Sequence, residues 1–153
     1  STLFLCHTYS FHEVFHFFIS LRLLGELLAL YRFPTVAIAQ RVLEPGRPMT
    51  PVVGLGGINS GVPFHVHGEG WSEVIHGAKR WFLFPRNGKR PVFDPNKSQY
   101  QWLWDEYHKL GDEERLSLHE CTIKPGEVLY FPSQWYHATL NIEPYTAFVS
   151  LFA

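Results

Sequence analysis

The stretch Gly61-Val-Pro-Phe-His65-Val-His67-Gly68 decides the fold of this chain, because it places two histidines two residues apart in a short β-type run. In a β-strand, residues i and i+2 project from the same face. We therefore expect His65 and His67 to lie side by side in one cavity. A third imidazole, His137, closes the stretch Tyr130-Phe-Pro-Ser-Gln-Trp-Tyr-His137 and opens another strand-like run. Neutral imidazole is the commonest metal ligand, and three ligands leave coordination positions open, so the three histidines predict a metal site inside a β-barrel.

The composition around this stretch is typical of one β-rich domain. The chain has 153 residues, enough for a single domain with a sizeable core. Aromatic residues make up 16% of it, with 12 glycines and 11 prolines, a combination that favours short strands joined by tight turns. The formal net charge of −1 gives no electrostatic reason to expect binding to nucleic acid or to an anionic membrane.

Short β-type runs follow one another closely through most of the chain. Turn-forming residues separate nearly all of them, for example Gly56-Gly57 and Pro125-Gly126. Many short strands with such turns indicate a sandwich or a barrel, the classes that include jelly rolls. The expected strands are residues 35–41, 52–55, 62–67, 72–75, 80–84, 121–123, 128–131, 135–142 and 146–152.

Two helices are expected beside the strands. One is inserted in the β body: Ser98 can cap a helix that runs to about Leu110, and Gly111 ends it. Residues 111–115 are expected to form a loop. The other helix covers about residues 11–31 and ends before Pro34.

The N-terminal part is rich in helix-forming residues, whereas the rest consists mainly of short β-type runs. This difference predicts a helical segment over residues 1–33 and a β domain over residues 34–153. Arg22 and Glu26 make the N-terminal apolar stretch a poor membrane span. The chain begins with Ser1 and not Met, which indicates a fragment or a processed form. Its two cysteines, Cys6 and Cys121, leave open either a disulfide or two buried thiols.

Several motifs resemble the jumonji-C (JmjC) branch of the cupin superfamily over about residues 31–153. His65-x-His67 matches the core of the first cupin motif. Gly126, Pro132, His137 and Asn141 match the second, except that Gln134 replaces its inner glycine. Gly77-Ala-Lys-Arg-Trp-Phe-Leu-Phe-Pro85 and Gly126-Glu-Val-Leu-Tyr-Phe-Pro132 are similar to two further JmjC strings.

This resemblance implies an all-β, double-stranded β-helix (cupin) fold and an Fe(II), 2-oxoglutarate-dependent oxygenase that hydroxylates a protein side chain. It makes His65 and His137 iron ligands, and Lys79 the partner of the far carboxylate of 2-oxoglutarate. Thr139 and Asn141 share the strand parity of His137, so they should face the same cavity and contact the cosubstrate or support the ligands. The aromatic residues near these motifs are expected to pack the barrel: Trp81, Phe82, Phe84, Trp135 and Tyr136.

The chain departs from the family pattern at two positions. His67 stands where JmjC oxygenases carry Asp or Glu, which raises the charge of an Fe(II) site from about +1 to about +2. Val62 stands where many members have a hydroxyl that contacts the cosubstrate, and valine cannot donate that bond. Glu73, six residues after His67, is an alternative ligand if it does not face solvent instead.

Three functions therefore remain open. The chain is a 2-oxoglutarate oxygenase with a three-histidine site, or a degenerate cupin domain that binds a partner protein, or a three-histidine enzyme that uses no 2-oxoglutarate. Asn96-Lys97-Ser98 is an N-glycosylation sequon. Together with the resemblance to a lumenal member of the family, it favours the endoplasmic reticulum over cytoplasm or nucleus.

Overall fold

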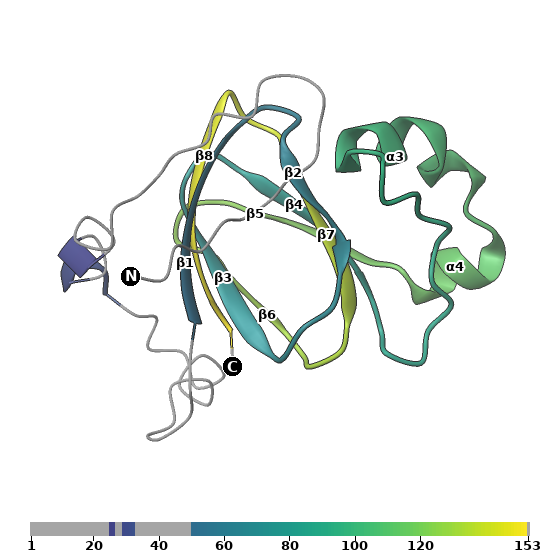
Figure 1. The fold of residues 1–153 in the computed structure, drawn as a ribbon, viewed down its shortest axis with the longest axis horizontal. Coiled ribbons are helices and arrows are strands. Elements are labelled where there is room, and N and C mark those ends of the chain that lie inside the picture. The colour runs from purple at the N-terminus through teal and green to yellow at the C-terminus, as the bar shows by residue number, and fades with distance from the viewer. Residues whose placement is uncertain (1–24, 27–28, 33–49, 153) are drawn as a thin grey trace.

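The structure, a computed structural model, describes residues 25–26, 29–32 and 50–152. Two four-stranded antiparallel sheets enclose a common interior (Figure 1). Their strand orders are β1-β8-β3-β6 and β2-β7-β4-β5. The elements are β1 (Thr50–Gly57), β2 (Gly61–His65), β3 (Gly70–His76), β4 (Lys79–Phe84), α3 (Gln99–Asp105), the 3₁₀ helix η1 (Tyr107–Lys109), α4 (Asp112–Ser117), β5 (His119–Ile123), β6 (Val128–Phe131), β7 (Tyr136–Asn141) and β8 (Tyr145–Phe152).

The all-β jelly-roll prediction is confirmed, and each run expected between residues 52 and 152 contains a strand. The last strand, β8, lies between β1 and β3, while β7 lies between β2 and β4. These pairings join strands far apart in the sequence, as in a double-stranded β-helix. They place β7, which carries His137 near its beginning, in the interior of its sheet between β2 and β4.

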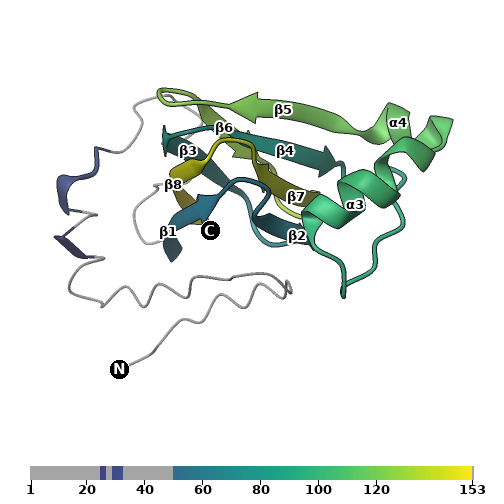
Figure 2. The same cartoon turned by 90° about the horizontal axis from the view of Figure 1, so that it is seen from above.

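Alternation along the strands divides the apolar side chains between the interior and the outer faces. Trp81 and Leu83 of β4 point inward and pack with Val74 and Phe131. Phe82, Phe84 and Tyr136 point outward and pack with Trp102 of α3 in a second core on the outer face of the sheet, so their expected packing role is confirmed. The helix covers the outer face of the β2-β7-β4-β5 sheet, as Figure 2 shows.

The helix inserted after β4 begins as expected and ends earlier. Ser98 Oγ accepts the backbone N–H of Gln101 at 3.2 Å, and Gln101 Oε1 accepts that of Ser98 at 2.9 Å, which forms a capping box. Helix α3 ends at Asp105, and η1 extends the helical path to Lys109.

The prediction of a loop over residues 111–115 is wrong, because helix α4 occupies residues 112–117. Glu114 Oε2 accepts the Gly111 N–H at 2.8 Å. The acidic residues Asp112, Glu113 and Glu114 fill its first turn, where negative charge interacts favourably with the helix dipole.

Most of the expected N-terminal helix, the strand over residues 35–41 and Cys6 lie outside the described residues. Residues 25–26 and 29–30 are helical. The ring of Tyr31 stacks on Trp71 at a centroid distance of 6.1 Å, and its hydroxyl donates to Glu73. Tyr31 therefore lies on the outer face of β3. In the described part of the chain, no helix has the length and apolar character needed to cross a membrane.

Candidate metal centre

Strands β2 and β7 bring two of the three predicted ligands together. His65 and His137 are register partners, and their ring centroids lie 4.3 Å apart. β2 ends at His65 and not at the expected residue 67, so His67 projects from the segment that follows the strand. Its ring nevertheless lies 5.2 Å from that of His65 and 4.7 Å from that of His137. The three histidines form one group whose ligand atoms all lie within 4.8 Å of one another.

Each imidazole is oriented by a bond from its Nδ1 to a backbone carbonyl oxygen. The acceptors are Pro63 for His65, Gly68 for His67 and Trp135 for His137, each at 2.8 Å. A carbonyl oxygen only accepts, so Nδ1 carries the proton and donates it. The lone pair of each neutral ring then lies on Nε2, which is how metal-binding histidines are usually held.

The spacing of the Nε2 atoms fits coordination. Nε2 of His67 lies 3.1 Å from Nε2 of His137. Two ligand nitrogens at about 2.1 Å from one metal ion lie roughly 3.0–3.4 Å apart in octahedral or tetrahedral geometry. Two unprotonated nitrogens this close repel each other unless a cation lies between them. The group therefore fits a divalent metal ion.

Burial keeps the ligands neutral. It lowers the pKa of His65 and of His67, and it lowers the pKa of His137 to about 3, with a further contribution from the charge of His65. The rings of Phe131 and Phe152 lie 5.3 Å and 4.3 Å from that of His67 and form an apolar wall. Neutral imidazoles in an apolar setting are ready to bind a metal without first releasing a proton.

A polar cluster lies further along β7 and its other neighbour, β4. Lys79 of β4 is the register partner of Asn141 of β7, and Lys79 is only 2% exposed. Its Nζ donates to Asn141 Oδ1 at 3.3 Å and lies 3.8 Å from the centre of the Phe148 ring. Thr139 Oγ1 accepts the backbone N–H of Val62 at 3.2 Å, which leaves the hydroxyl proton of Thr139 to be donated elsewhere.

The two clusters lie along the same pair of strands, β4 and β7. Leu83 pairs with His137 and Lys79 pairs with Asn141, so four residues, or roughly 13 Å of strand, separate the two positions. Lys79 lies near enough for its charge to contribute to the lowered pKa of His65. The pair Trp81 and Thr139 lies between the two positions.

Trp81 gives independent evidence that a polar group belongs in this space. The side chain is buried, and among the described residues its indole Nε1 has no acceptor. A buried donor without a partner costs about 1–3 kcal/mol, so an acceptor supplied by a bound molecule would remove a real penalty. The sequence predicted only a packing role for Trp81 and gave no role to Phe148. The available signal was the alternation along each strand, which places both side chains on the inward face.

The predicted alternative ligand Glu73 lies elsewhere. It shares the outward parity of Trp71 on β3 and accepts the hydroxyl of Tyr31, so it faces away from the histidines. The ligand group formed by the described residues contains no carboxylate.

Asn96 of the predicted sequon lies in an exposed turn before α3. The position is accessible, but its glycosylation stays a prediction.

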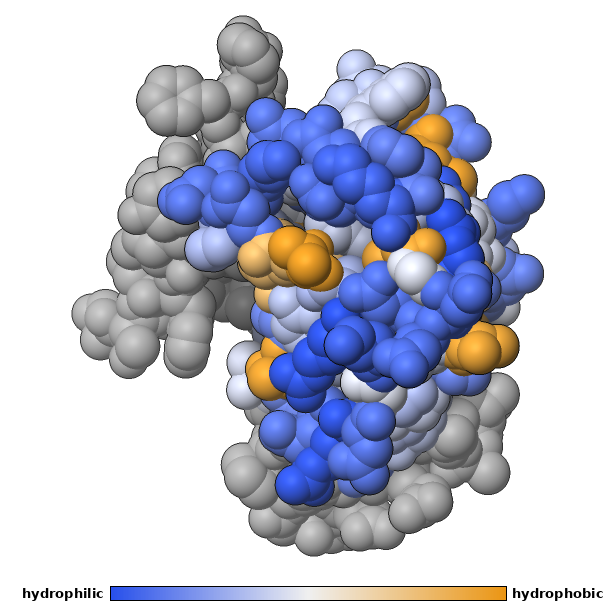
Figure 3. Space-filling view, turned by 90° about the vertical axis from the view of Figure 1, so that its right-hand side faces the viewer, coloured by the Kyte–Doolittle hydropathy of each residue, from blue (hydrophilic) through white to orange (hydrophobic). Residues whose placement is uncertain are grey.

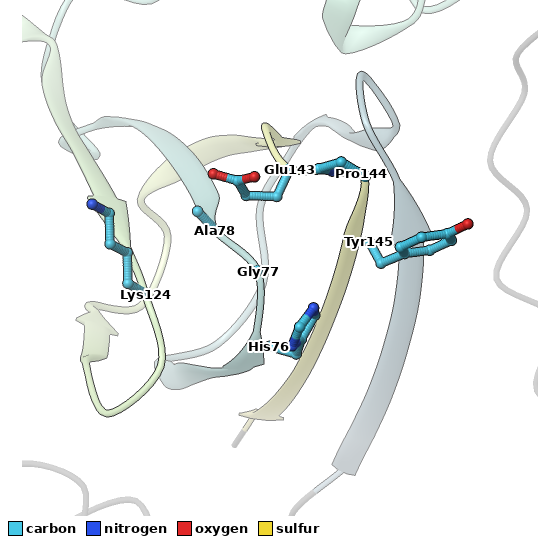
Figure 4. Close-up of a pocket in the computed structure, with 7 residues that line it drawn as sticks. All are labelled: His76, Gly77, Ala78, Lys124, Glu143, Pro144 and Tyr145. Atoms are coloured by element: carbon cyan, nitrogen blue, oxygen red, sulfur yellow. The ribbon is translucent and has the colours of Figure 1, made fainter.

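A separate hollow of about 380 Å³ opens among the turns after β3, β5 and β7 (Figure 4). The imidazole of His76 points into it and the ring of Tyr145 points away. None of the three clustered histidines lines it. The metal centre and the hollow are therefore different features.

Comparison with known proteins shows the family of the chain. The family model described as a cupin-like domain matches residues 60–152, more than half of the chain. The chain is 54% identical over 99 residues to JmjC domain-containing protein 8 of Homo sapiens, covering 65% of this chain and 36% of that protein. It is 37% identical over 109 residues to the lysine-specific demethylase JMJ21 of Arabidopsis thaliana, covering 61% of this chain and 11% of that protein.

The chain thus spans about a third of the length of the JmjC relatives it matches, and less of the demethylase. Among solved structures, oxalate decarboxylase from Bacillus subtilis has a TM-score of 0.47 at 16% identity, covering 68% of this chain and 20% of that one. At that level of likeness, the fold assignment rests on the two sheets themselves.

Proposed function

Because the chain belongs to the cupin-like domain family, we propose that it is a metal-dependent oxygenase that uses Fe(II) and 2-oxoglutarate to hydroxylate a protein side chain. The observation that carries the proposal is the convergence of three Nε2 lone pairs, each fixed by a backbone carbonyl, on one point of the barrel interior. Lys79 supports the cosubstrate assignment, because it lies four residues from the register partner of His137 on the paired strands β4 and β7.

Each residue has a defined task in this proposal. His65, His67 and His137 would hold Fe(II), which supplies the redox chemistry of O₂ when it is bound. Lys79 would bind the far carboxylate of 2-oxoglutarate as a buried point charge, while Asn141 orients the ammonium. Thr139 and Trp81 would donate to the cosubstrate between the two ends. Phe131 and Phe152 would keep water from the ligands.

A protein side chain is the substrate class that fits the partial exposure of the site. His65 and His67 are half-buried while His137 is buried, so the cluster lies in the interior and is partly accessible from outside. The name of one relative, lysine-specific demethylase, describes action on a lysine side chain. We propose the same class, a residue of a protein, for this chain.

The decisive experiment measures metal content and 2-oxoglutarate turnover together. We expect about one equivalent of Fe(II) per chain and Fe(II)-dependent consumption of 2-oxoglutarate. His137→Ala should lose both, and Lys79→Ala should keep the metal and lose turnover. If Lys79→Ala keeps full activity, the chain is a three-histidine enzyme that uses no 2-oxoglutarate.

A second candidate, a cupin domain that binds a partner protein without turnover, is favoured by one contact. The Phe148 ring already covers the ammonium that the cosubstrate would need. Figure 3, which faces the helices, shows a mostly hydrophilic surface with small separate hydrophobic areas. Trp104 of α3 and Leu116 of α4 are among the exposed apolar residues. Partner binding that is unchanged in His137→Ala, with no turnover in the parent chain, would favour this candidate.

We also propose a secretory-pathway location, from the accessible Asn96 of the sequon. Loss of a glycosidase-sensitive mass in Asn96→Gln after secreted expression would support this proposal.

A further inference from the structure

The phenyl ring of Phe148 lies over the ammonium of Lys79, which also donates to Asn141. Phe148 projects inward from β8, whereas Lys79 and Asn141 belong to the other sheet. Nζ lies 3.8 Å from the ring centre, which is a close cation–π contact at a buried position. The ammonium thus contacts both an aromatic face and an amide oxygen.

The position of the Phe148 ring depends on the absence of a side chain at a glycine in the neighbouring strand. Gly54 of β1 is the register partner of Phe148. A Cβ atom built on Gly54 would lie 2.1 Å from Cζ of Phe148 and 2.3 Å from Cε1. The ring therefore uses the space that a side chain at residue 54 would fill.

A cosubstrate carboxylate and the Phe148 ring compete for the same cation. The ring presents the negative face of its quadrupole to the ammonium, and a carboxylate brings a full charge to the same atom. The ammonium is buried and the ring covers one of its faces, so a carboxylate that binds at that face must replace the ring.

We propose that Phe148 is the residue that sets affinity and selectivity at the far end of the dicarboxylate site. Only a ligand whose far end carries a full negative charge can replace the ring on Lys79, so 2-oxo acids with one carboxylate bind poorly. The same competition weakens binding of the dicarboxylate itself. This inference rests on the proposed function, because it assigns Lys79 to the cosubstrate.

The test is a titration of 2-oxoglutarate into the full chain loaded with Ni²⁺, followed by isothermal calorimetry. Imidazole sites bind Ni²⁺ well, and no turnover is needed. Phe148→Leu keeps an apolar side chain and removes the aromatic face. We expect its Kd for 2-oxoglutarate to fall about tenfold. Nickel content should not change.

Phe82→Leu is the matched control. Phe82 also faces a cation, since Arg80 Cζ lies 4.9 Å from its ring centre, but it lies on the outer face of β4 under α3. It should leave the Kd unchanged. Lys79→Ala should abolish binding in both the parent and the Phe148→Leu background, and thermal unfolding checks that each variant is folded.

The outcomes separate this inference from the proposed function. Tighter binding in Phe148→Leu alone supports the inference, and so does binding that appears only in that variant. Equal or weaker binding in Phe148→Leu, with a parent chain that binds, overturns the inference and leaves the cosubstrate assignment intact. If neither chain binds 2-oxoglutarate while both hold Ni²⁺, the inference and the proposed cosubstrate are both wrong.

Discussion

The backbone N–H of Gln134 donates to the carbonyl oxygen of His67 at 3.0 Å. This bond ties the corner before β7, which leads to His137, to the segment that carries the second ligand. Gln134 has a φ of 65°, in the left-handed region that favours glycine. The cupin motif has glycine at this position, so the chain keeps the backbone shape of the motif with a different residue.

Replacing Gln134 with glycine should stabilise the protein. The left-handed conformation costs a residue with a Cβ about 1–2 kcal/mol, and the greater freedom of glycine in the unfolded chain offsets part of that gain. We expect Gln134→Gly to raise the unfolding free energy by roughly 0.5–1 kcal/mol, measured by urea unfolding. Gln134→Ala is the control: it keeps the Cβ and should not be stabilised. A loss of stability in Gln134→Gly would contradict the argument.

Changing His67 to aspartate should improve the oxygenase site if the proposed function is right. A carboxylate compensates more of the charge of Fe(II) and binds it with an oxygen ligand that suits hard cations. His67→Asp should retain iron and consume 2-oxoglutarate faster than the parent chain. His67→Ala is the matched control and should hold less iron. Slower consumption in His67→Asp with full iron content would mean that the three-histidine set is the working form.

The metal-free protein should become less stable as the pH falls. Burial lowers the pKa of all three ligand histidines in the folded chain, that of His137 to about 3, below the ordinary histidine value of about 6.5. Below that value the unfolded chain binds more protons, so the unfolding free energy falls by up to about 1.4 kcal/mol per pH unit for each histidine. Urea unfolding at about pH 7 and about pH 5 measures the slope. His137→Gln should show a shallower slope of unfolding free energy against pH. An unchanged slope would contradict the lowered pKa of His137.

The sequon can be tested separately from the helix cap that overlaps it. Ser98 supplies both the sequon hydroxyl and the N-cap of α3. In secreted expression, Asn96→Gln should lose a glycosidase-sensitive mass and keep stability. Ser98→Ala should lose the mass and about 1 kcal/mol of stability, whereas Ser98→Thr should keep both. A parent chain without any glycosidase-sensitive mass would argue against the secretory location.

Removing the carboxylate of Glu73 should not affect the metal. Glu73 faces outward and accepts the hydroxyl of Tyr31. Glu73→Ala should therefore keep the full metal content, measured by mass spectrometry, and lower the melting temperature because Tyr31 loses its acceptor. Glu73→Gln retains an acceptor and should lose less stability. Loss of metal in either variant would place Glu73 among the ligands after all.

Strand patterns predicted most of the β body because the period of two is a local property. Residues 128–131 have the same bounds as β6, and the other expected strands from residue 52 onward differ from the observed ones by at most two residues at either end. Helix α4 was missed because Gly111, which was interpreted as the stop signal of the preceding helix, is also the N-cap of α4. The packing role of Phe82 and Phe84 was predicted, but not that they pack on the outer face under α3, because apolar side chains lie on both faces of β4.

The sequence by itself determined which residues share a face: His65 with His67, and His137 with Thr139 and Asn141. Parity cannot tell which faces meet, because a strand can present either side to the interior. The tertiary structure decided that His67 reaches His137 across 70 residues, that Glu73 faces away, and that Phe148 of one sheet covers Lys79 of the other. These contacts depend on long-range register and on the packing of two sheets, and neither leaves a local signal in the chain.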